Sequence, residues 1–180
     1  MRVVESRQQR LRRLLEPVHD RAQAFSRSIA KSRSDGDDLF QEALVRALGK
    51  LDGLRDDRAF RGWLYRVIIS VHRNRYRRAF WQRLLPLTHE PADPADQHPD
   101  ALGAADRARK ALATLPHEQR EAIVLHDIEG WRIEEIAELE GTSVSAIKSR
   151  LSRGRDRLRD VYTRKFAMRS EASLVPGETP

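Results

Sequence analysis

Charge is sorted along this chain in a way that limits how it can fold. Seven arginines and no acidic residue lie between Arg61 and Arg83. The next stretch, Leu84 to Asp106, holds five acidic residues and four prolines but no lysine or arginine. Because prolines interrupt helices and such a segment buries little apolar surface, we expect a flexible linker flanked by two small domains. The predicted boundaries are residues 1–83 for the first domain, 84–106 for the linker, 107–165 for the second domain and 166–180 for a disordered tail.

Hydrophobic residues on both sides of the linker recur at helical spacing. Before it, apolar positions repeat at three- and four-residue steps over residues 39–51 and again over 60–76, which is typical of helices with one buried face. After it, breaks at Pro116, Gly130 and Gly141 separate four further helices. We find no alternation of strand period, so the predicted fold class is all-α.

The composition narrows the choice of partners. The chain has 34 Lys and Arg against 27 Asp and Glu, and the net charge of +7 attracts nucleic acid first and an anionic membrane surface second. No stretch reaches the ~18 apolar residues of a membrane span, and no apolar core follows the arginine-rich start, so we expect a cytoplasmic protein without stable membrane insertion. Without cysteine, disulfides and thiolate chemistry are excluded. Nucleotide-binding glycine loops and hydrolase motifs are absent too, so neither a cofactor nor a metal is predicted.

The spacing of Ala137, Gly141 and Ile147 is typical of a helix-turn-helix. A small residue lets the two helices approach, a glycine adopts the positive φ of the tight turn, and an aliphatic residue packs the second helix onto the first. The second helix is predicted from about Ser143 to about Tyr162. Its buried face carries Ile147, Leu151, Gly154 and Leu158, and its opposite face presents Lys148, Ser149, Ser152 and Arg153.

A polar and basic helix face behind a tight turn suits the major groove of DNA. The alternative is a solvated amphipathic helix in a small bundle. The preceding helix, residues 133–140, is acidic, and this sorting of charge between the two helices favours DNA binding.

The basic segment 61–83 interleaves aromatic side chains with its arginines. Arginines neutralise phosphates and aromatic rings stack on unpaired bases, so the combination suits single-stranded or melting DNA. The alternative is structural, with Trp63 and Tyr65 in the core and Trp81 packed at the end of the helix.

Three segments together carry a family resemblance, through their residues, order and spacing. They are DDLFQEALVRAL, then FRGWLYRVIISVHRNRYRR, and after the linker ALATLPHEQREAIVLHDIEGWRIEEIAELEGTSVSAIKSRLSRGRDRLRD. Over residues 36–81 and 108–160 the chain thereby resembles bacterial RNA polymerase sigma factors of the extracytoplasmic-function (ECF) group of the sigma-70 family. The resemblance implies a region-two domain that binds core RNA polymerase and the minus-ten element, and a region-four helix-turn-helix that binds the minus-thirty-five element. Such a protein directs the polymerase to promoters and assists melting without being an enzyme.

The resemblance also assigns residues. Docking on core polymerase falls to Asp38, Leu39, Gln41 and Glu42, although helix capping and solubility would account for Asp38. The loop from Arg55 to Phe60 and the following helix match the part that captures an unpaired base, with minus-ten contacts at Phe60, Trp63, Ser70, Arg73, Asn74 and Arg77. Minus-thirty-five contacts fall to Lys148, Ser149, Ser152 and Arg153. An anti-sigma factor is an expected further partner.

Three residues depart from the family pattern. Ser70 stands where relatives often carry Asn, which reduces its hydrogen-bonding options. Arg132 occupies a helix N-cap position where Ser or Thr is usual, at a cost of about 1 kcal/mol. Gly154 replaces a common Ala, at a similar cost in helix propensity of about 1 kcal/mol.

Two other classes of function stay open from the residues alone. A helix-turn-helix regulator would bind duplex operators tightly and symmetrically without polymerase, and would use its first half to dimerise. A recombinase or nuclease would use the helix-turn-helix for targeting, and its best support is the metal-ligand chemistry of a cluster in the linker, His89, Asp93, Asp96, His98 and Asp100. That cluster lies among prolines, with nothing to hold its geometry. For the linker itself, the resemblance implies a path through the polymerase near the RNA, and the alternative is a solvated tether that repels DNA.

Overall fold

A computed structural model describes residues 5–84 and 103–172, and within these ranges the chain forms helices and no strand. The predicted all-α class is confirmed. The helices of the first half are α1 (Arg7–Leu15), α2 (His19–Ile29), α3 (Arg33–Lys50) and α4 (Phe60–Leu84). Three short 3-10 turns join them: η1 (Glu16–Val18), η2 (Leu51–Gly53) and η3 (Asp57–Ala59).

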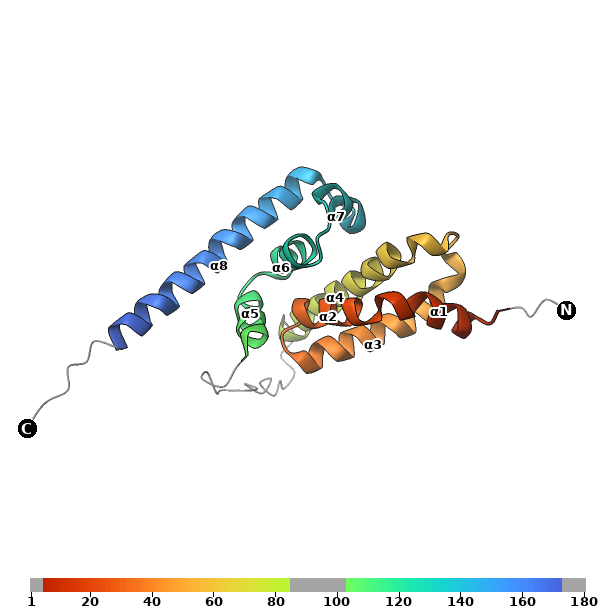
Figure 1. Ribbon diagram of the computed structural model, residues 1–180, viewed down its shortest axis with the longest axis horizontal. Coiled ribbons are helices and arrows are strands. Elements are labelled where there is room, and N and C mark those ends of the chain that lie inside the picture. Colours follow the sequence, from red (N-terminus) through yellow and green to blue (C-terminus); the bar gives the residue numbers. More distant parts are fainter. Residues whose placement is uncertain (1–4, 85–102, 173–180) are drawn as a thin grey trace, which may run out of the picture.

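The second half holds α5 (Ala104–Ala113), α6 (His117–Ile123), a π-helical turn η5 (Val124–Ile128), α7 (Ile133–Glu140) and α8 (Val144–Ala172). In Figure 1, α5 and α6 lie between the bundle of α1 to α4 and the long helix α8. The predicted breaks at Pro116, Gly130 and Gly141 all separate elements, and both glycines have positive φ.

Serine side chains explain where several helices begin. The hydroxyl of Ser6 accepts the backbone N–H of Gln9, while the Gln9 side chain accepts the N–H of Ser6, so α1 starts with a capping box. Ser32 and Ser143 cap α3 and α8 by accepting the backbone N–H three residues further on, at 3.0 and 3.1 Å.

One apolar core runs through both halves of the chain. The ring of Tyr65 in α4 lies 4.7 Å from that of Phe25 in α2 and 5.2 Å from that of Trp131, which precedes α7. The two predicted domains are therefore docked rather than separate. Burying three aromatic side chains in a shared cluster provides the hydrophobic driving force for this docking.

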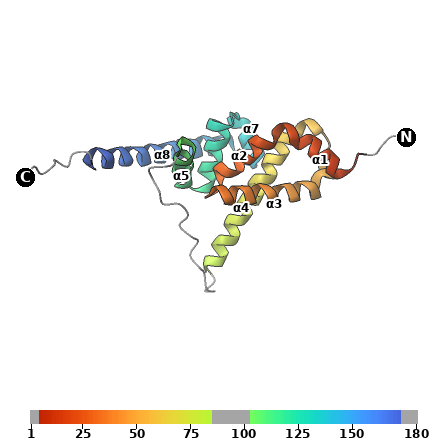
Figure 2. The same cartoon turned by 60° about the horizontal axis from the view of Figure 1, so that its bottom comes forward.

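Two helices extend beyond the shared core. The last turns of α4 project from the bundle in Figure 2, and the second half of α8 projects in Figure 1. Helix α8 continues to Ala172, so the predicted end near Tyr162 and the predicted disorder from Phe166 are wrong as far as Ala172. No proline or glycine interrupts residues 155–172, which allows the helix to propagate. Residues 173–180 lie outside the described residues.

The helices on either side of the predicted linker extend into it. Helix α4 includes Leu84, the first residue of the predicted linker, and α5 already begins at Ala104, inside it. The alanines at 104, 105 and 108 favour a helix there. Residues 85–102 lie outside the described residues.

Substituting Gly36 by alanine is expected to destabilise the first half strongly. A Cβ at Gly36 would lie 2.4 Å from the Cα of Arg27, and backbone cannot move aside cheaply where α3 crosses α2. We expect a loss of about 3 kcal/mol in the free energy of unfolding. Gly49→Ala, in the same helix with nothing within 4 Å of the added Cβ, should instead stabilise by about 0.5 kcal/mol. Urea unfolding of both variants measures this, and equal stabilities would contradict the prediction.

Candidate nucleic-acid interface

The helix-turn-helix has the predicted geometry. Gly141 ends α7 with φ +64°, and the N–H of Thr142 donates to the carbonyl of Ala137 at 2.9 Å, which closes the turn. Ala137 is buried where α7 meets α8, and Ile147, in the first turn of α8, is fully buried. These three positions behave as their spacing predicted.

The exposed face of α8 carries the residues predicted to read the minus-thirty-five element. Lys148, Ser149, Ser152 and Arg153 all have exposed side chains. Leu151 and Gly154 lie on the opposite, buried face. Basic and hydroxyl groups on an open helix face can donate to phosphates and to base edges, so this face is free to enter a major groove.

Gly154 has a packing role that its helix propensity does not reveal. A Cβ at this position would lie 2.6 Å from Cδ1 of Ile123, so glycine lets α8 approach α6 closely. The expected cost in propensity is therefore offset by contact between the two helices.

The residues predicted to contact the minus-ten element fall into two groups. Ser70, Arg73, Asn74 and Arg77 line one cleft of about 1010 Å³ along α4. The opposite wall of this cleft belongs to the second half of the chain and includes Glu118 and Glu140. The structure thus brings these four residues together, but places them against acidic groups.

Phe60 and Trp63 form the second group, at the start of α4. Trp63 is half-buried and borders a separate cavity of about 540 Å³. Phe60 is only 2 % exposed, and its ring lies 5.9 Å from that of Trp63. Phe60 is therefore a core residue that packs beside Trp63, and its buried ring is not accessible for the predicted minus-ten contact in this arrangement.

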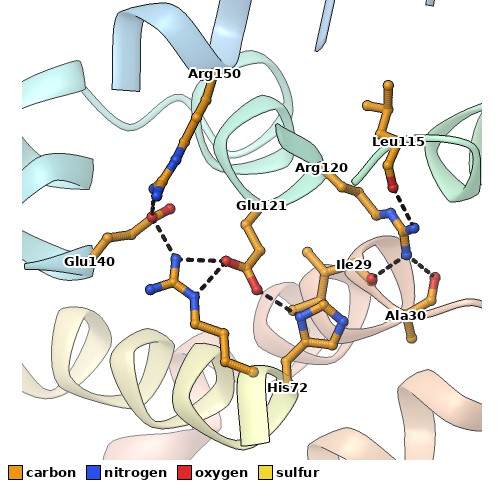
Figure 3. Close-up of polar contacts among 9 residues, drawn as sticks. Ile29, Ala30, His72, Leu115, Arg120, Glu121, Glu140 and Arg150 are labelled. Atoms are coloured by element: carbon orange, nitrogen blue, oxygen red, sulfur yellow. Dashed lines mark hydrogen bonds and ion pairs between the residues drawn. The ribbon is translucent and has the colours of Figure 1, made fainter. Parts of the chain in front are cut away.

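A buried polar cluster closes the cleft on α4 (Figure 3). Arg73 donates to one carboxylate oxygen of Glu121 through Nε at 3.0 Å and Nη2 at 2.8 Å, and contacts Glu140 at 2.6 Å. His72 Nδ1 lies 2.7 Å from the other oxygen of Glu121. Arg150 reaches Glu140 from α8. Since Arg73 comes from α4 and both carboxylates from the second half, the cluster links the two halves.

The two carboxylates of this cluster are held in different ways. Glu121 has both oxygens hydrogen-bonded and is fully buried. Glu140 keeps one buried oxygen without a hydrogen-bond partner. Burial raises the pKa of Glu140, and the nearby charge of Glu121 raises it further. Glu140 is therefore the weaker part of the connection to Arg73.

Arg120, the neighbour of Glu121 in α6, forms a second connection between the halves. It is 1 % exposed and donates to four backbone carbonyls: Ile29 at 2.7 Å, Ala30 at 3.3 Å, Ala113 at 3.0 Å and Leu115 at 2.9 Å. The carbonyls of Ile29 and Ala30 lie at the end of α2, and those of Ala113 and Leu115 lie at and just after the end of α5. Figure 3 shows Ile29, Ala30 and Leu115 around Arg120. The partial negative charge of two helix C-termini thus surrounds a buried guanidinium.

Further contacts tie α4 to the segment around α7. Arg66 donates to the carbonyls of Glu138 and Leu139 at the C-terminus of α7, both at 3.3 Å. The hydroxyl of Tyr65 donates to Glu129 at 2.7 Å. Burial, together with this acceptor, raises the pKa of Tyr65, so the hydroxyl stays protonated as a donor.

Acidification is expected to weaken the docking through His117, whose ring stacks on Tyr76 of α4 at 4.7 Å. Burial lowers the pKa of His117 from its ordinary value of 6.5, so the docked form binds fewer protons than a separated form. Separation is therefore favoured as the pH falls below about 6.5. Glu140, whose pKa is raised, acts in the opposite direction, and a variant without the histidine separates the two contributions.

Small-angle scattering measures this effect as a larger radius of gyration at about pH 5.5 than at about pH 7.5. His117→Phe keeps an aromatic ring but cannot titrate, so it should reduce the change. Identical scattering of the unmodified protein at both pH values would contradict the expectation.

The residues predicted to dock on core polymerase lie in the second turn of α3 and just after it. Asp38 and Gln41 are exposed, while Glu42 is half-buried and paired with Arg75 at 2.8 Å. Leu39 is 1 % exposed and belongs to the core, so its side chain is not accessible for the predicted contact with polymerase. Helix α3 starts at Arg33, capped by Ser32, so capping does not explain Asp38.

Known proteins share both halves of this chain. Residues 14–82 match the family described as Sigma-70 region 2, and residues 105–158 match Sigma-70, region 4. The ECF RNA polymerase sigma factor SigM of Mycobacterium tuberculosis is 31% identical over 140 residues, which cover 78% of this chain and 70% of SigM. The RNA polymerase sigma-E factor of Streptomyces avermitilis is 35% identical over 156 residues, covering 81% of this chain and 82% of the relative.

Solved structures agree with these matches. The sigma factor RpoE of Bartonella quintana, solved in complex with the anti-sigma factor NepR, superposes with a TM-score of 0.63 at 29% identity, over 84% of this chain and 96% of RpoE. CnrH, solved in complex with the cytosolic domain of CnrY, gives 0.61 at 28% identity, over 85% and 87%. This chain belongs to the ECF sigma factors of the sigma-70 family.

The family assignment settles the class of function. An ECF sigma factor binds core RNA polymerase and directs it to promoters in transcription initiation, and it is not an enzyme. This assignment replaces the two alternative functions, an operator-binding regulator and a recombinase or nuclease. The cluster that the enzyme alternative relied on, His89 to Asp100, lies outside the described residues. Among residues 5–84 and 103–172, no helix of this sigma factor has the length and apolarity to cross a membrane.

Sequence reasoning missed the groups that dock the two halves of this sigma factor. Arg120 and Glu121 sit side by side in α6, just before an apolar run, and both are buried. A charged pair adjoining a buried helical pattern is a usable signal, because charged side chains are rarely buried without partners. Nothing local, however, identifies Ile29 or His72 as those partners.

Proposed function

We propose that this sigma factor reads its promoter with two faces, one in each half. The exposed face of α8 around Lys148 and Arg153 binds the minus-thirty-five element as duplex. The face of α4 around Ser70, Arg73 and Asn74, with Trp63 at its start, binds the minus-ten element as it melts. The observation that carries this proposal is the juxtaposition of those α4 side chains along one cleft.

The docked arrangement cannot perform both tasks together. The two elements lie about 25 base pairs apart, roughly 85 Å of duplex, whereas α4 and the C-terminus of α7 are in hydrogen-bond contact. Arg73 is also occupied by Glu121 and Glu140. We infer that the halves separate when the protein binds core polymerase, and that the acidic groups facing α4 give way to promoter DNA.

Transcription in vitro tests the proposal. Core enzyme with this protein should produce a transcript from a cognate promoter, and base changes in either element should reduce it by about tenfold or more. Lys148→Ala should lose the dependence on the minus-thirty-five element and keep that on minus-ten. Transcription that ignores both elements would overturn the proposal.

We further propose an anti-sigma partner and a cytoplasmic location. RpoE and CnrH were each solved with such a partner, and this chain covers most of both. Purification from native cells, with and without a tag on this chain, should recover polymerase subunits and one small inhibitor. Recovery of polymerase alone would remove the anti-sigma part and leave the rest.

A further inference from the structure

Arginines of helix α1 hydrogen-bond to the loop between α3 and α4, which consists of residues 51–59 and is called the α3–α4 loop below. Arg10 donates to the carbonyls of Leu51 at 3.4 Å and Leu54 at 2.8 Å, and to one oxygen of Asp57 at 2.6 and 3.1 Å. A single guanidinium therefore holds the start, the middle and the end of this loop. Arg7 adds a contact to Asp52, through Nε at 3.2 Å.

Asp57 is the centre of this contact. Its other carboxylate oxygen accepts from Arg13 at 2.9 Å, and Arg13 is held in turn by both oxygens of Glu5, at 2.9 and 3.0 Å. Hydrogen bonds from Arg10 and then Arg13 lower the pKa of Asp57, so it stays charged. Two arginines on one carboxylate form a directional clamp, because the planar guanidinium fixes where each acceptor lies.

The opposite edge of the loop is open. Arg55, Asp56 and Arg58 are exposed, while Leu54 is buried as an anchor. Asp56 also accepts the backbone N–H of Arg58 at 2.9 Å, which shapes η3. The α3–α4 loop thus has a clamped inner edge and an exposed outer edge that is mostly cationic.

The loop also borders the cavity at the aromatic start of α4. Leu54 and Ala59 of the loop line the cavity of about 540 Å³ that Trp63 also borders. Any shift of the loop would therefore change how Trp63 and the exposed loop residues are arranged around a base.

We propose that Arg10, supported by Arg13 and Asp57, is a positioning residue that sets the α3–α4 loop for base discrimination in the minus-ten element. The inference rests on the proposed function, and it gives helix α1 a role that no motif in its sequence indicates. Arg10 itself does not touch DNA. It acts by holding the loop carbonyls and Asp57, so its loss leaves the loop able to adopt other arrangements.

The test uses the full chain with core polymerase and a set of templates that carry each base in turn at every position of the minus-ten element. The unmodified protein should prefer the cognate base at the loop-contacted position by at least about fivefold. Arg10→Gln should reduce that preference to below about twofold, while the loss caused by a changed minus-thirty-five element stays the same. Asp57→Asn should act in the same direction.

Arg12→Gln is the matched control. It removes the same charge from the same helix, and the exposed side chain of Arg12 makes no hydrogen bond or ion pair with another described residue. Its base preference should equal that of the unmodified protein. Arg10→Lys keeps the charge but offers a single donor group, so it should give an intermediate preference and serves if Arg10→Gln fails to fold.

A merely structural Arg10 predicts a different result. Transcription by Arg10→Gln and Arg10→Lys would then fall by the same factor on every template, with base preference unchanged, and this would overturn the inference. If the unmodified protein itself ignored the minus-ten sequence, the proposed function would fail, and this inference with it.

Discussion

Covalently joining α4 to α7 should abolish promoter-dependent transcription. The chain has no cysteine, so Arg66→Cys and Glu138→Cys introduce the two thiols at exposed positions that already meet across the halves. A bismaleimide with a cleavable disulfide spacer would hold α4 against α7. We expect the transcript to fall by at least about tenfold, because the state able to bind both promoter elements is no longer populated.

Cleaving the spacer with reductant supplies the control. Activity should return to that of the double variant before cross-linking, and each single-cysteine variant with a monofunctional maleimide should stay active. Undiminished transcription by fully cross-linked protein would show that the halves need not separate.

Arg120→Met should disrupt the docking and lower the free energy of unfolding by about 4 kcal/mol. Methionine fills much of the same volume but donates no hydrogen bond, so four buried carbonyls lose their donor, at about 1 kcal/mol or more each. Two of these carbonyls, Ile29 and Ala30, belong to the first half. Two others, Ala113 and Leu115, belong to the second half, so the second half should also lose stability by itself.

Urea unfolding followed by tryptophan fluorescence measures this change, since Trp131 lies between the halves. The unmodified protein should unfold in one transition and Arg120→Met in two, with an increased radius of gyration before unfolding. Arg12→Met, at an exposed position, should change neither. A single transition with an unchanged midpoint in Arg120→Met would contradict the role given to this guanidinium.

Under the proposed function, the interface between the halves also controls the access of promoter DNA to α4. Arg66 and Arg73, which could meet phosphates, are bound by helix-end carbonyls and by carboxylates of the second half. The face of α8 remains open in the same arrangement. The docked form therefore covers one of the two faces proposed to bind DNA and leaves the other accessible, so under that proposal opening is a step at which a partner protein can act.

Local patterns in the sequence determined much of this protein. Helical periodicity, the serine caps and the positive φ of Gly141 depend on neighbouring residues, so the helices and the helix-turn-helix could be predicted. The exposed residues of α8 followed from the same periodicity. The acidic helix 133–140 was also predicted, but no local pattern indicates that it contacts α4.

Only the tertiary structure decided where the two halves meet and which polar groups hold them. Glu121 pairs with Arg73, 48 positions earlier, and Arg120 reaches the carbonyl of Ile29, 91 positions earlier. Such pairs depend on how whole helices cross, and no spacing along the chain encodes that. The same holds for the grip of Arg10 on the α3–α4 loop, where carbonyl acceptors belong to the backbone and carry no residue-specific signal.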